Sequence, residues 1–202
     1  MKRLVALSFA TMAALAQEYH FGTTTVSTSA LQGKVYLIRP GTDRLPNFDK
    51  LRPEGSVYTN SLNIWPQSFQ EGFPGVTSRY EWFAIDYSGK FWIEEGGTYR
   101  FSLLSDDGAR LWVDDKVVVD LDGTHSPISS SGSAHLTRGV HRLRVAYFQG
   151  PQFHVALVLA VAKPGGPWKI FHTDDFMPPK DPEEWVKGKI KDVKPLENTP
   201  RN

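Results

Sequence analysis

Between residues 81 and 162 the chain is divided into short apolar runs, each closed by turn-forming residues. Residues 99–103 and 143–147 place a large apolar side chain at every second position. This period of two is typical of a β-strand with one buried face. Residues 154–162 are almost wholly apolar, as in a strand covered on both faces. Strands with short turns roughly every 10 residues predict an all-β fold, an antiparallel sandwich or barrel.

Other runs fill in this pattern. Residues 82–87 predict a strand that ends at Ser88-Gly89, and residues 91–93 predict a separate one. Asp114-Asp115 lies between the runs 110–113 and 116–120 and predicts a tight hairpin turn.

Residues 33–80 read differently. A short β-type run at 35–38 stops at Pro40, and four more prolines follow before residue 80. Regular helix is disfavoured there, since proline breaks helical hydrogen bonding. We expect an irregular N-terminal segment held by aromatic side chains, namely Phe48, Tyr58, Trp65, Phe69 and Phe73.

The two ends predict export and a flexible tail. Lys2 and Arg3 precede an apolar run that is too short to span a bilayer, and small residues follow it. We interpret residues 1–16 as a signal peptide, the alternative being a buried N-terminal helix, and 17–32 as a lead-in linker. The globular domain is expected over 33–179, and 180–202 as a charged, proline-containing tail with one short helix near 183–189. The longest later apolar run, 155–162, is too short to cross a membrane as a helix.

Composition removes several function classes. The 23 basic and 22 acidic residues nearly cancel, which disfavours a nucleic-acid binder. With no cysteine there is no disulfide, thiolate zinc site or cysteine nucleophile. The sequence has no HExxH, GxSxG, P-loop or GxGxxG motif. We therefore expect no catalytic residues and no enzyme activity.

Two stretches carry a family resemblance: GTYRFSLLSDDGARLWVDD at 97–115 and LTRGVHRLRVAYF at 136–148. Together they resemble the PA14 domain family, strongly over 81–162 and more loosely over 33–179. The resemblance implies a β-sandwich or barrel, which agrees with the strand pattern. PA14 domains occur in glycosidases, yeast adhesins and bacterial surface proteins, and their commonest known activity is carbohydrate binding.

The adjacent acids Asp106 and Asp107 are the main candidate site. Successive side chains of a regular strand point to opposite faces, so both could reach one ion only if the backbone bends. Resemblance to the sugar-binding members implies a cis peptide between them, a bound Ca²⁺ and sugar hydroxyls on that ion. It also places Gln149 where the adhesin lectins have a ligating Asn, so Gln149 is a third candidate metal ligand on a longer side chain. Alternatively, residues 106–108 form a structural turn whose carboxylates accept backbone N–H bonds.

Three further residues complete the candidate ligand site. Asp122 and His125 belong to a polar loop expected to pack near Asp106, and Trp112 could stack on a sugar face. His141 is expected to pack or hydrogen-bond locally. The candidate ligand-binding set is therefore Asp106, Asp107, Asp122, His125 and Trp112.

These observations predict an exported, non-catalytic carbohydrate-binding module in the periplasm, at the cell surface or secreted. Its expected partner is a glycan or cell-envelope polysaccharide, and its expected cofactor is Ca²⁺. The alternative is a structural or protein-interaction domain with a protein partner and no working sugar or metal site. A trans Asp106–Asp107 bond with both carboxylates satisfied by the backbone would favour that alternative. A hydrolase would need two carboxylates about 5–10 Å apart in a concave pocket.

Overall fold

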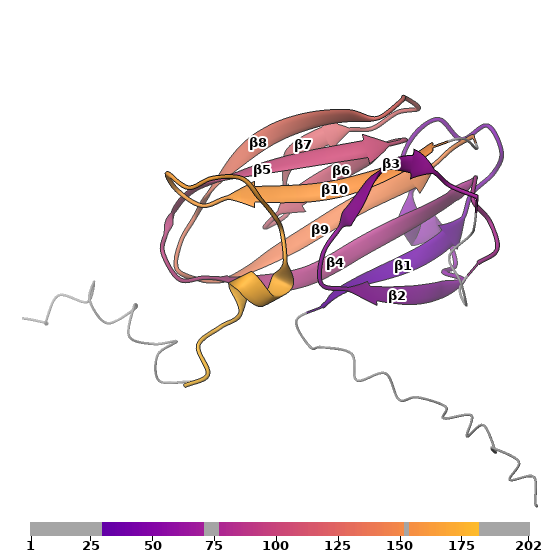
Figure 1. Ribbon diagram of the computed structural model, residues 1–202. Helices are drawn as coiled ribbons and strands as arrows, with labels where there is room; N and C mark the ends of the chain where they lie inside the picture. Colours follow the sequence, from indigo (N-terminus) through magenta and orange to yellow (C-terminus); the bar gives the residue numbers. More distant parts are fainter. Residues whose placement is uncertain (1–29, 71–76, 152–153, 182–202) are drawn as a thin grey trace, which may run out of the picture.

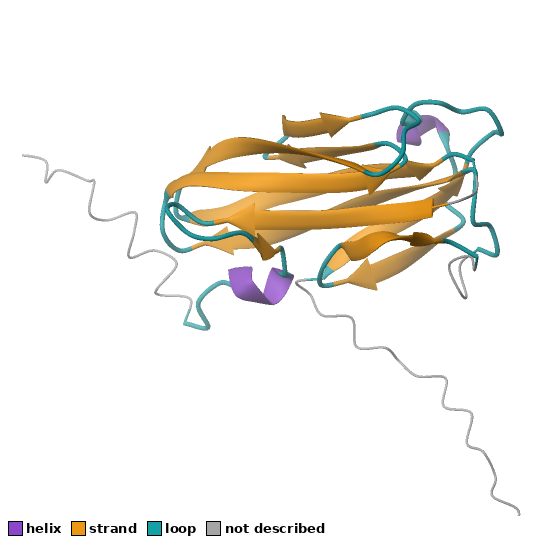
Figure 2. Ribbon diagram, turned by 45° about the horizontal axis from the view of Figure 1, so that its top comes forward, coloured by secondary structure: helices purple, strands orange, loops and turns teal. Residues whose placement is uncertain are grey.

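The computed structural model describes residues 30–70, 77–151 and 154–181, which form two antiparallel β-sheets packed face to face (Figures 1 and 2). The first sheet has six strands in the order β2-β1-β4-β9-β6-β7. Its strands are β1 (Leu31–Leu37), β2 (Gly55–Thr59), β4 (Phe83–Ile93), β6 (Ala109–Val113), β7 (Lys116–Leu121) and β9 (Gly139–Gln149).

The second sheet runs in the order β11-β10-β5-β8, and β3 also pairs with β10. Its strands are β3 (Asn63–Ser68), β5 (Gly97–Asp106), β8 (Ile128–Leu136), β10 (His154–Ala162) and β11 (Lys169–Ile170). Two short 3-10 helices, η1 (Phe48–Lys50) and η2 (Thr173–Phe176), lie in the connections. The predicted all-β antiparallel sandwich is confirmed.

The core lies between the sheets and follows the predicted alternation. On β5, Tyr99, Phe101 and Leu103 are buried while Arg100 between them is exposed. The odd-numbered residues of β10 join the same core, and its even-numbered residues from Ala156 onward are also largely covered. Burial of this apolar area provides the main driving force for the fold.

Strand β4 differs from the prediction, because it continues through Ser88-Gly89 without a break. Ser88 pairs with Gln32 of β1 on one side and with Arg144 of β9 on the other. A Cβ atom on Gly89 would lie 2.6 Å from Cδ2 of Leu31, so glycine allows β1 to pack closely. Here glycine serves close packing and does not end the strand.

The segment before residue 80 is less irregular than predicted, since it contains β2 and β3. Tyr58 and Trp65, which were expected to help hold this segment, are 49% and 58% exposed and do not pack into the core. Pro66 is tolerated inside β3 because that strand is at a sheet edge and is irregularly paired. Phe48 and Phe69 do pack, against Tyr36 and Phe83, with ring centroids 5.1 and 6.0 Å apart. Phe73 lies outside the described residues.

The domain begins slightly earlier than predicted. Leu31 is the first residue of β1 and its side chain is buried in the core, so residues 31–32 belong to the sandwich and not to a linker. The predicted signal peptide at 1–16 and the predicted helix near 183–189 lie outside the described residues. Within the described residues, no helix has the length and apolar character to cross a membrane.

The predicted hairpin at Asp114-Asp115 is present between β6 and β7. Both residues have positive φ angles, +48° and +66°, as in the type I′ turns that match the twist of a hairpin. His141 packs locally beside this turn, with Nδ1 2.5 Å from Oδ2 of Asp114 and Nε2 2.8 Å from the carbonyl oxygen of Thr137. Asp114 and Asp115 therefore have a structural role in this hairpin turn.

Candidate functional site

Three parts of the chain meet at the end of the sandwich where β5 finishes (Figure 1). They are the end of β5 with Asp107, the loop between β7 and β8, and the connection from β9 to β10. Together they line a hollow of about 490 Å³, within the range of roughly 300–1,000 Å³ typical of ligand sites. The lining residues are Asp106, Asp107, Thr124, His125, Ser126, Pro151 and His154.

The peptide bond between Asp106 and Asp107 is cis, as the family resemblance implies. Both carboxylates line the hollow, and the two residues are only 8% and 4% exposed. The pair is therefore gathered at one site and not divided between the two faces of a strand.

Asp107 holds the surrounding loops together. Its Oδ2 accepts the N–H of Gly150 at 2.8 Å, and its Oδ1 accepts the N–H of His125 at 3.1 Å. Burial raises the pKa of Asp107, and these two hydrogen bonds oppose that rise. In this respect Asp107 fits the structural-turn interpretation.

Asp106 is different, because its carboxylate has no hydrogen-bond partner within the described part of the chain. Burial, together with the neighbouring Asp107 charge, raises its pKa to about 6, and His125 and His154 act in the opposite direction. The two carboxyl groups therefore lie side by side in the hollow, and negative charge on Asp107 opposes ionisation of Asp106. A bound cation would relieve their repulsion and supply the missing partner.

Gln149 does not present the oxygen expected of a metal ligand. Its side chain is buried, and its Nε2 faces Oδ2 of Asp107 at 3.4 Å and the carbonyl oxygens of Pro151 and His154 at 3.3 and 3.0 Å. Its Oε1 accepts from the Tyr147 hydroxyl at 2.5 Å. All three neighbours of the nitrogen are acceptors, so this orientation is the one that satisfies the amide. Gln149 thus donates hydrogen bonds to the loop after β9, whereas the sequence predicted that its oxygen would bind a metal ion.

The other predicted residues are divided between this hollow and other places. His125 lines the hollow as expected, and its ring nitrogens lie 2.8 and 2.9 Å from the carbonyl oxygens of Leu121 and Ser126. Asp122 does not line it, because its carboxylate accepts the N–H of Leu45 at 2.7 Å and faces Arg110 at 3.4 Å.

Trp112 also lies away from the hollow. It projects from β6, and the guanidinium groups of Arg110 and Arg144 lie 5.6 and 4.8 Å from its ring centroid. Asp122 and Trp112 were predicted to line the acidic site, but both side chains lie outside it and make other contacts.

Sequence reasoning missed Thr124, Ser126, Pro151 and His154 in the lining. The first two flank His125, so their proximity to it was the available signal. Nothing in the local sequence shows that the start of β10 comes beside Asp106, because that follows from the pairing of Ala156 with Asp106.

The chemistry of the donors fits a hard cation, but the protein ligands alone are few. No cluster of three or more His, Asp or Glu side chains suited to a metal occurs among the residues that the structure describes. Calcium takes six to eight oxygen ligands, so Asp106 and Asp107 would supply only part of its shell. Such an ion would keep positions open for backbone carbonyls, water or ligand hydroxyls.

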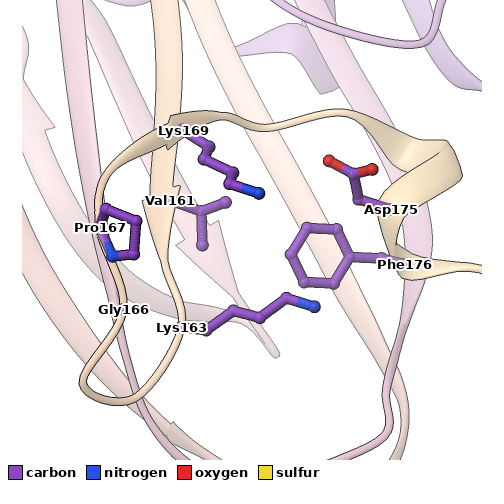
Figure 3. A pocket seen from close by; sticks show the side chains of 7 residues that line it. All are labelled: Val161, Lys163, Gly166, Pro167, Lys169, Asp175 and Phe176. Atoms are coloured by element: carbon purple, nitrogen blue, oxygen red, sulfur yellow. The ribbon is translucent and has the colours of Figure 1, made fainter.

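A second hollow lies at the opposite end of β10 (Figure 3). Lys163 and Lys169 point into it, together with the carboxylate of Asp175 and the ring of Phe176. None of the residues predicted from sequence lines it. The acidic hollow is therefore the candidate functional site.

Solved structures show the same fold. A PA14 sugar-binding domain from an RTX adhesin superposes with a TM-score of 0.61 at 19% identity, covering 73% of this chain and 97% of that domain. The PA14 domain of the MpAFP antifreeze protein gives 0.59 at 16% identity, over 72% of this chain and 88% of that one. The A domain of epithelial adhesin 9 from Candida glabrata, in complex with Galβ1-3GlcNAc, gives 0.52 at 14% identity, over 73% and 88%.

A search among curated protein sequences found no match. The family model described as PA14 domain matches residues 68–168, which is half of the chain and includes Asp106, Asp107 and Gln149. Together with the shared fold, this match shows that the chain belongs to the PA14 domain family.

Proposed function

We propose that this PA14 domain binds carbohydrate at the Asp106–Asp107 hollow with the help of a divalent cation, for which calcium is the best chemical match. The observation that carries the proposal is the carboxylate of Asp106, which faces the hollow beside a second carboxylate and has no hydrogen-bond partner in the described part of the chain. Two PA14 or adhesin structures with the same fold are described as sugar-binding or contain a disaccharide, which supports this ligand class.

The protein groups have separate tasks in this proposal. Asp106 would give its free carboxylate to the cation, and Asp107 would give what its backbone hydrogen bonds leave available. When bound, the cation would offer open coordination positions to vicinal sugar hydroxyls. Thr124 and Ser126 are hydroxyl donors and acceptors in the lining, suited to hydrogen bonds with the same sugar.

The same site argues for binding without catalysis. A glycoside hydrolase places its two carboxyl groups on either side of the scissile bond. Here the two acids are consecutive residues, and Asp107 is tied to the backbone of Gly150 and His125. Export of the domain, directed by residues 1–16, is part of the proposal, since cell-surface glycans and free calcium are found outside the cytoplasm.

A glycan array tests the proposed function. The full-length mature chain is applied to the array in 1 mM CaCl₂, and in parallel in excess chelator. We expect a limited set of bound glycans with calcium and loss of their signal with chelator. Binding that is indifferent to chelator would contradict the role of the cation. A blank array under both conditions would favour the structural or protein-interaction alternative.

A further inference from the structure

Three strands bring an exposed tryptophan close to the acidic pair on the outer face of the second sheet. Asp106 at the end of β5 is directly opposite Ala156 of β10. On its other side, β10 pairs with β3, where the register shifts between Val155 and Leu157. Val155 pairs with Gln67 and Leu157 with Ile64, so Trp65 and Pro66 together oppose Ala156.

The side-chain directions agree with this placement. Leu157 and Ile64 pack toward the core, so their neighbours Ala156 and Trp65 point to the outer face, as Asp106 does. Trp65 is 58% exposed, whereas Ala156 between it and Asp106 is completely buried. The row Asp106–Ala156–Trp65 therefore crosses the sheet with a small residue in the middle.

The row has the dimensions of a short saccharide. Two inter-strand spacings of about 4.8 Å place the Trp65 backbone roughly 10 Å from that of Asp106. An indole ring gives a flat apolar face that excludes water from the C–H face of a sugar ring, and it retains one N–H donor for a hydroxyl. Asn63 and Ser68 of the same strand are exposed beside it and offer further polar contacts.

We propose that Trp65 forms a second saccharide subsite, so that the ligand is an oligosaccharide of at least two rings. One ring lies at the Asp106–Asp107 hollow, and the next lies on the exposed indole of Trp65, two strands away on the same face. This inference rests on the proposed function and goes beyond it, because it assigns the ligand length and a specificity residue that does not touch the cation.

The test compares the wild-type chain with Trp65→Ala and Trp65→Tyr on an array of monosaccharides and disaccharides in CaCl₂. Trp168→Ala is the matched control, since Trp168 is also exposed and lies after the opposite end of β10. Calorimetric titration with CaCl₂ alone accompanies each variant, because Trp65 is not expected to contribute to cation binding.

We expect Trp65→Ala to weaken disaccharide binding about tenfold or more, with monosaccharide and calcium binding unchanged. Trp65→Tyr should recover part of the loss, and Trp168→Ala should behave as wild type. Equal disaccharide binding by wild type and Trp65→Ala would overturn the subsite and leave the proposed function intact. If the wild type itself binds no saccharide, both proposals are overturned.

Discussion

Replacing Asp106 with asparagine is expected to abolish calcium binding and, in the presence of chelator, to make the domain more stable than wild type. Asp106 is largely buried, and its carboxylate faces the hollow beside Asp107 with no hydrogen-bond partner in the described part of the chain. A site built for a ligand commonly costs stability when the ligand is absent. Calorimetry with CaCl₂ and thermal unfolding followed by circular dichroism would measure the two effects.

The expected magnitudes follow from general chemistry. Loss of a ligating carboxylate should weaken calcium binding by more than about 100-fold, since even partners of metal ligands contribute 10–100-fold. Wild type at a free calcium concentration of about 100 times Kd should gain roughly 2.7 kcal/mol of stability, and Asp106→Asn should gain none. In chelator, each 1 kcal/mol gained by the variant would raise Tm by about 2–4 °C.

The pH dependence of the chelated protein has a definite sign. The pKa of Asp106 in the folded state, about 6, is above its ordinary value of 3.8, so folding favours the protonated form. The destabilisation by this group is therefore absent below pH 3.8 and complete above pH 6. Wild type should become more stable as the pH falls from 7 to 5, and Asp106→Asn should show a shallower change. Equal pH profiles, or a less stable variant in chelator, would contradict this account.

Replacing Asp107 with alanine should have the opposite effect on stability while also removing calcium binding. Two backbone donors lose their acceptor, the N–H groups of Gly150 and His125, whereas Nε2 of Gln149 keeps two other carbonyl acceptors. A buried donor left without a partner costs about 1–3 kcal/mol, so a total of roughly 2–4 kcal/mol is expected. Urea unfolding in chelator measures this loss.

Asp106→Ala is the matched control for Asp107→Ala. Asp106→Ala removes a carboxylate of the same size one residue away, but leaves no donor unpaired. It should therefore not lower the free energy of unfolding in chelator to the same extent. Similar destabilisation by both alanine variants would show that the two acids do not have the separate roles assigned to them.

The fold class could be predicted from the sequence, because the alternation of apolar and polar residues is visible within each short segment. Residues 99–103 predicted a half-buried strand, and β5 has that burial pattern. The prediction that a strand ends at Gly89 is wrong, because this glycine allows close packing against Leu31, which is distant in sequence. Pro66 and the other prolines before residue 80 likewise favoured an irregular segment, whereas the edge position of β3 beside β10 allows a strand there.

The candidate site was predictable only in its acidic pair. Asp106 and Asp107 are recognisable as a motif, and His125 was expected nearby because its polar loop was predicted to pack against Asp106. The orientation of the Gln149 amide depends on Tyr147 and on carbonyl oxygens of the following loop. The sequence analysis chose Trp112 as the stacking residue, because nothing local to Trp65 shows that β3 pairs with β10 and brings it toward Asp106.

A crystal structure of the domain with calcium and the strongest glycan from the array tests the central claim most directly. The account predicts anomalous density for one cation within about 2.3–2.6 Å of oxygens from both Asp106 and Asp107. It also predicts sugar hydroxyls on the same ion. A glycan bound elsewhere, such as in the hollow of Lys163 and Lys169, with no cation between the two acids would contradict it.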